Sequence, residues 1–144
     1  MNIKQIIQKT AVAGVTLALL GVAAFPISAA VLADGAFSNV SIYNTGESCL
    51  GTAQLQADAT KFEITITKWT HANGLVGQGD VEITVENSRG IEVGKHEFSG
   101  KGTWTLTKTI DDMYPINIWA TNTRSTILPG SGDRVISGYW EFSN

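Results

Sequence analysis

The chain has 144 residues, the size of one domain with or without a removable segment. Hydrophobic residues make up 43% of the chain and charged residues 16%, a composition that excludes an intrinsically disordered protein. Ten basic residues against thirteen acidic ones give a formal charge of −3, which provides no basic surface for nucleic acid.

The first thirty residues have the organisation of a secretory signal peptide. Lys4 and Lys9 form a basic start, and an uncharged, mostly apolar run follows, which ends in Pro26 and several small side chains. This order predicts cleavage after Ala30, with a cut after Ala33 as the alternative. The uncharged run is also long enough to span a hydrocarbon core of ~30 Å, so an uncleaved anchor is the competing interpretation.

The predicted cleavage divides the chain into a signal peptide over residues 1–30 and one mature domain over residues 31–144. The short basic start is typical of bacterial export, and we expect a secreted, extracellular protein. Removing Lys4 and Lys9 leaves eight basic and thirteen acidic residues, a net charge of −5. The mature protein is thus mildly acidic.

The mature chain shows an apolar period of two, which is the pattern of strands with one buried face. Short segments rich in Gly, Asn and Pro separate these runs and have the composition of turns. The pattern predicts an all-β, antiparallel β-sandwich with no helix longer than about two turns. About eight strands are expected, over residues 40–43, 52–56, 62–69, 80–86, 91–98, 103–110, 116–121 and 134–142.

Three of the four tryptophans are assigned to a face of their strand by this alternation. Trp104 is in register with apolar neighbours and is expected in the core. Trp69 and Trp119 fall on the face opposite the isoleucines of their strands. An outward tryptophan among threonine and asparagine is a platform on which a sugar can stack, although a covered face would make the same ring part of the core.

Two loops contain adjacent apolar pairs among polar residues: Leu75 with Val76, and Ile127 with Leu128. Because loops are normally polar, apolar tips indicate contact with a partner, a glycan or a lipid surface. The alternative is that each pair folds back over an open end of the sandwich. Together with Trp69 and Trp119, these four residues make up the predicted ligand-binding set.

Catalytic and metal signals are weak in this sequence. The only histidines are His71 and His96, and no second histidine follows His96 at the spacing of a zinc-protease motif. The weak calcium candidates are Asp111, Asp112 and Asp133, but an aspartate at a turn commonly hydrogen-bonds its own backbone. We therefore expect no enzyme activity, no metal and no cofactor.

The only cysteine is Cys49, so the chain has neither an intramolecular disulfide nor a cysteine-based zinc site. It is expected to act as a small buried hydrophobe. If it were exposed, it could link two chains outside the cell, but a monomer is favoured over a Cys49-linked dimer.

The leading hypothesis is a secreted, non-catalytic β-sandwich that binds a surface ligand, namely a glycan, cell wall or a partner protein. One alternative is a membrane-active or antibacterial protein that inserts the two apolar loops, against which the acidic charge argues. The second alternative is a structural protein of an extracellular matrix, assembled through threonine-rich strands that pair edge to edge.

Overall fold

The computed structural model describes residues 30–43, 46–71, 80–123 and 134–144, and every regular element in these residues is a β-strand. The prediction of an all-β domain with about eight strands is confirmed. No helix long and apolar enough to cross a bilayer occurs in the described part of the chain. The strands are β1 (Val31–Ile42), β2 (Glu47–Ala53), β3 (Ala59–His71), β4 (Val81–Asn87), β5 (Glu92–Phe98), β6 (Gly102–Ile110), β7 (Ile116–Asn122) and β8 (Arg134–Ser143).

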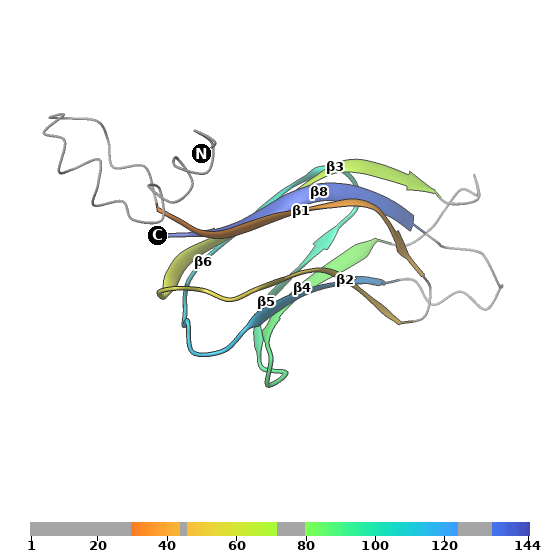
Figure 1. Cartoon of the computed structure of the whole chain (residues 1–144). Helices are drawn as coiled ribbons and strands as arrows, with labels where there is room; N and C mark the ends of the chain where they lie inside the picture. The colour runs from red at the N-terminus through yellow and green to blue at the C-terminus, as the bar shows by residue number, and fades with distance from the viewer. Residues whose placement is uncertain (1–29, 44–45, 72–79, 124–133) are drawn as a thin grey trace, which may run out of the picture.

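The strands form two antiparallel sheets of four, stacked as two layers (Figure 1). One sheet has the order β1-β8-β3-β6 and the other the order β2-β7-β4-β5. Strand β1 therefore pairs with β8, β2 with β7, β3 with β6 and β4 with β5. This is the strand order of a jelly roll, in which the first half of the chain pairs with the second half across both sheets.

The core lies between the two sheets and is built by the alternation seen in the sequence. Phe62, Ile64 and Ile66 point inward from β3, while Val81, Ile83 and Val85 point inward from β4, and all six are almost completely buried. Burial of each such side chain contributes about 1.5–3 kcal/mol. The opposite side chains of the same strands form the outer faces of the sandwich.

Trp140 fills the core beside the two edge strands β1 and β2. Its indole N–H donates to the carbonyl oxygen of Leu50 at 3.4 Å, and only 5% of the residue is exposed. The ring lies against Gly35 of β1 and Gly51 of β2, where a Cβ atom added to either glycine would lie 2.5 Å from the indole. Both glycines are required by the size of this one side chain.

Strands β1 and β2 begin well before the ranges that the sequence predicts. Strand β1 begins at Val31 rather than at residue 40, and two register shifts against β8 interrupt its alternation. Asn39 lies at the second shift with a φ of 52°, a left-handed conformation that breaks the period-two pattern. Strand β2 begins at Glu47 and ends at Ala53, so Cys49 lies inside a strand, where it is exposed rather than buried as expected.

Candidate functional site

Trp69 lies on the core side of β3, opposite to the face that strict alternation predicts. A register shift against β8 between Ile66 and Lys68 adds a residue to β3 and reverses the faces beyond it. Trp69 consequently packs against the core, and the Arg134 guanidinium lies 4.5 Å from the centre of its ring. Burial lowers the pKa of Arg134. The structure thus gives Trp69 a packing role and does not bring it to the face that holds Trp119.

Five of the other predicted residues lie outside the part of the chain that the structure describes: Leu75, Val76, Ile127, Leu128 and Asp133.

Asp111 and Asp112 are in the exposed turn between β6 and β7. The Asp111 carboxylate accepts a hydrogen bond from the backbone N–H of Met113 at 3.1 Å, and the backbone N–H of Asp112 donates to the Asp58 carboxylate at 3.0 Å. Asp111 therefore stabilises its own turn. Across the described ranges, no three side chains of His, Cys, Asp or Glu are grouped so that they could hold a metal ion.

Trp119 lies on the outer face of the β2-β7-β4-β5 sheet, where alternation places it. It is in β7, a central strand, and its neighbours across the sheet are Cys49 of β2 and Thr84 of β4. The indole N–H donates to the Glu86 carboxylate at 2.9 Å. The ring is partly buried and is fixed in orientation by this hydrogen bond.

The residues around Trp119 form three rows across the strands, which together we call the Trp119 face. Apart from Trp119 and Cys49, every side chain in these rows is polar. The rows are Glu47, Thr121, Glu82 and Glu97; then Cys49, Trp119, Thr84 and Lys95; then Thr52, Asn117, Glu86 and Glu92.

The Trp119 face is strongly acidic, since it holds five glutamates and one lysine. Glu82 and Glu97 are directly opposite each other on β4 and β5, and Lys95 lies 3.7 Å from the Glu82 carboxylate. Hydrogen bonding with Asp80 raises the pKa of Glu97, and the charges of Asp80 and Glu82 raise it further. The face therefore repels anions and favours an uncharged or basic ligand.

His96 is in β5 and contacts two aromatic rings. Its ring stacks on Trp104 with centroids 5.4 Å apart and meets the edge of Phe98 at 4.9 Å. Trp104 in turn packs against the core, as its register predicts. Through these contacts, His96 packs over Trp104 at the edge of the sandwich where β5 and β6 lie.

The sequence interpretation did not single out Glu86 or Tyr139. Glu86 shares the outer face of β4 with Glu82 and Thr84, so alternation alone could have placed it on that face, while its position beside Trp119 depends on strand pairing. Tyr139 is on the outer face of β8 and is 51% exposed. Its alternation with the buried Trp140 was visible in the sequence, but its neighbours across the sheet depend on strand pairing.

No protein-family model matches the chain, and no curated protein shows significant similarity to its sequence. The fold and the outer faces define an all-β sandwich with the strand order of a jelly roll.

Proposed function

We propose that this protein is a secreted, non-catalytic β-sandwich that binds an uncharged surface polysaccharide on the Trp119 face. The jelly-roll strand order is compatible with lectins and with many other functions, so the fold alone does not support this choice. The support comes from the side chains of the face and from their charge.

The observation that carries the proposal is the position of Trp119. A single aromatic ring lies in the middle of a polar sheet face, and its N–H is already bound to Glu86 at 2.9 Å. The C–H face of a sugar ring can stack on such an aromatic surface, while its hydroxyl groups need polar partners nearby. Thr84 and Asn117 provide a hydroxyl and an amide next to the ring. An extended polymer suits a site on the surface of a sheet.

The charge of the Trp119 face selects among ligands. Its five glutamates repel acidic polysaccharides and the anionic surfaces of most bacterial membranes. This repulsion argues against the membrane-active alternative, whose proposed inserting loops lie outside the described residues. A neutral polysaccharide meets no such repulsion, and an amino sugar gains from the carboxylates.

The start of β1 supports the proposed processing after Ala30. Val31 is the first residue of β1 and pairs with Ser143 of β8. A cut after Ala33 would remove the first three residues of the strand. Cleavage after Ala30 keeps the whole strand in the secreted domain.

The proposal is tested by whether a sugar protects Cys49 from alkylation. Cys49 is exposed and is directly across from Trp119, so a ligand stacked on the ring covers the thiol. The mature protein is alkylated with a maleimide in the presence of soluble oligosaccharides of cellulose, chitin or β-1,3-glucan. At least one neutral oligosaccharide is expected to slow alkylation in a saturable way.

Two controls make this assay specific for the Trp119 face. Trp119→Ala is expected to abolish the protection, and oligomers of alginate, which are anionic, are expected to give none. If no neutral oligosaccharide slows alkylation, or if protection persists in Trp119→Ala, the proposal is wrong. Vesicles of phosphatidylglycerol are tested in parallel, and protection by them alone would favour the membrane-active alternative.

A further inference from the structure

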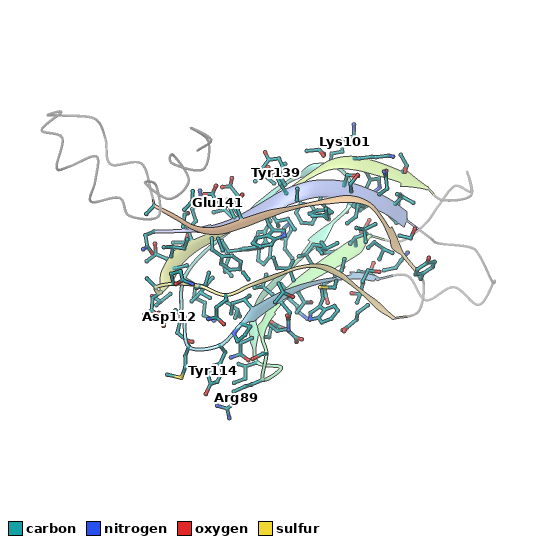
Figure 2. All side chains as sticks on the ribbon, in the orientation of Figure 1. Arg89, Lys101, Asp112, Tyr114, Tyr139 and Glu141 are labelled. Atoms are coloured by element: carbon teal, nitrogen blue, oxygen red, sulfur yellow. The ribbon has the colours of Figure 1, made fainter. Side chains whose placement is uncertain are left out.

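The opposite side of the sandwich carries a second exposed aromatic ring. Tyr139 is 51% exposed on the outer face of the β1-β8-β3-β6 sheet. The other large exposed hydrophobic residues of the described ranges are Tyr43, Ile91 and Met113, and all three lie outside the strands. Figure 2 shows Tyr139 and Glu141 projecting from this sheet, away from the other layer.

The surroundings of Tyr139 repeat those of Trp119. Each ring is on the strand next to an edge, β8 in one sheet and β7 in the other. Ala36 of β1 and Thr65 of β3 flank Tyr139 across the sheet, just as a small residue and a threonine flank Trp119. The small Ala36 side chain leaves one side of the tyrosine ring open. The two outer faces therefore present the same arrangement of small, aromatic and hydroxyl side chains.

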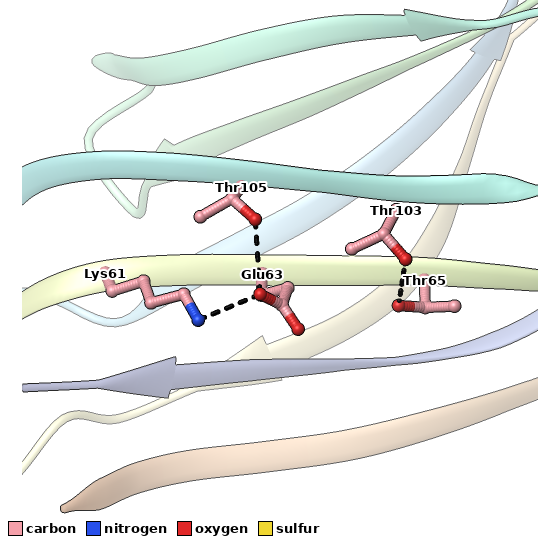
Figure 3. A network of polar contacts seen from close by, with 5 residues as sticks. All are labelled: Lys61, Glu63, Thr65, Thr103 and Thr105. Atoms are coloured by element: carbon pink, nitrogen blue, oxygen red, sulfur yellow. Dashed lines mark hydrogen bonds and ion pairs between the residues drawn. The ribbon is translucent and has the colours of Figure 1, made fainter. Parts of the chain in front are cut away.

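Polar side chains of β3 and β6 form two sets of contacts on this face (Figure 3), and Thr65, a member of one set, is directly across from Tyr139. Lys61 lies 2.9 Å from the Glu63 carboxylate, which also accepts a hydrogen bond from Thr105 at 3.2 Å. The Thr65 and Thr103 hydroxyls are 2.8 Å apart and share a hydrogen bond. Lys61 lowers the pKa of Glu63, which keeps this carboxylate ionised as an acceptor.

These groups are already oriented, and they retain unused hydrogen-bonding capacity. A threonine hydroxyl offers one donor and two acceptor positions, and a carboxylate accepts several hydrogen bonds. Asp34, Glu141 and Glu63 follow one another across three strands, with Lys61 beside them. Three carboxylates and the Lys61 ammonium thus lie on one side of Tyr139, and Lys68, paired with Ser137 of β8, lies on the other. An uncharged ligand meets little net charge on this mixed surface.

We propose that the Tyr139 face, formed by Tyr139, Ala36, Thr65, Thr103 and Glu63, is a second site for an uncharged polysaccharide. This inference rests on the proposed function, because it assigns the same class of ligand to both faces. The two faces belong to opposite layers of the sandwich and point away from each other. One molecule therefore binds two polysaccharide chains at once and cross-links them.

The test compares binding with cross-linking. Wild type, Trp119→Thr, Tyr139→Thr and the double variant are mixed with nanofibrils of cellulose and of chitin, with reductant present so that Cys49 cannot join two molecules. Threonine keeps the preference for a strand. Co-sedimentation at low fibril concentration measures binding, and turbidity at high fibril concentration measures cross-linking. Tyr43→Thr is the control, because Tyr43 is 56% exposed but lies outside both sheets.

Wild type and Tyr43→Thr are expected to bind one of the fibrils and to cross-link it. Each single variant at Trp119 or Tyr139 is expected to bind with an apparent affinity within a few-fold of wild type and to lose cross-linking. The double variant is expected to bind at least about ten-fold more weakly, the effect of removing both aromatic contacts. Thermal unfolding of every variant confirms that each is folded.

The failure of this inference differs from the failure of the proposed function. If Trp119→Thr alone abolishes binding, if Tyr139→Thr still cross-links, or if wild type binds without cross-linking, the second site is refuted and the first remains. If wild type binds neither fibril, both proposals are contradicted.

Discussion

Replacement of Trp119 by alanine should lower the free energy of unfolding only modestly, because this ring lies on an outer face and is not part of the core. The change removes one hydrogen bond, from the indole N–H to Glu86 at 2.9 Å, and a partly buried apolar surface. A hydrogen bond to a carboxylate contributes about 1.5–3 kcal/mol, and the lower end applies here because solvent reaches the pair. With the lost apolar contact, the free energy of unfolding should fall by about 2 kcal/mol.

Trp140 is the matched comparison, since it is the same residue type on another strand but is only 5% exposed. Trp140→Ala leaves a cavity between the sheets and should cost about 3–5 kcal/mol. Urea denaturation of both variants gives the two values under identical conditions, with a common m-value as the test of two-state unfolding. A loss above about 3 kcal/mol for Trp119→Ala would show that its ring is a core residue, and the argument for a sugar platform would then fail.

Three further predictions concern packing, pH and processing. Gly51→Ala places a Cβ 2.5 Å from the Trp140 indole and should cost about 1–3 kcal/mol in urea denaturation, with a smaller loss in a Trp140→Phe background; equal losses in both backgrounds would contradict the packing. Glu97→Gln should raise the Tm at pH 7 and change it little at pH 3. Hydrogen bonding with Asp80 raises the pKa of Glu97 above its ordinary 4.5, so the contribution of Glu97 to stability falls as pH rises through the folded-state pKa. A gain in Tm at pH 3 as large as at pH 7 would refute this. Mass spectrometry of the secreted protein should find Val31 as its first residue, and an intact Met1 would contradict export with cleavage.

The alternation of apolar residues was enough to predict the number of strands and the sandwich. It placed Phe62, Ile64 and Ile66 on the buried face of β3, and it placed Trp119 on an outer face. Each of these assignments depends only on the two-residue period of an extended strand. The pairing of the strands into a jelly-roll order does not follow from this period, because every strand with one apolar face satisfies it equally.

The errors occur where the backbone departs from regular pairing. Trp69 was assigned to the outer face because alternation was continued through Ile66, where the structure has a register shift. The same reason explains why the predicted start of β1 was too late. The left-handed backbone at Asn39 interrupts the alternation, so residues 31–38 do not show the period-two pattern of a strand. A bulge is defined by the partner strand, so a single strand's sequence does not reveal it.

The candidate surface was likewise only half visible in the sequence. The outward direction of Trp119 followed from alternation, but its hydrogen bond to Glu86 required the pairing of β7 with β4. The position of Tyr139 between Ala36 and Thr65 likewise depends on the pairing of β8 with β1 and β3. The neighbours that make each ring a candidate binding surface come from strands distant in the chain.

The most direct test of the central claim is a titration of the mature protein with neutral oligosaccharides, followed by the nuclear magnetic resonance signals of the four tryptophan indole N–H groups. The Trp119→Phe variant identifies the signal of Trp119. A hexasaccharide of cellulose, chitin or β-1,3-glucan is expected to shift this signal in a saturable way and to leave that of the buried Trp140 unchanged. If the Trp119 signal stays in place with all three sugars up to millimolar concentration, the Trp119 face is not a polysaccharide-binding site.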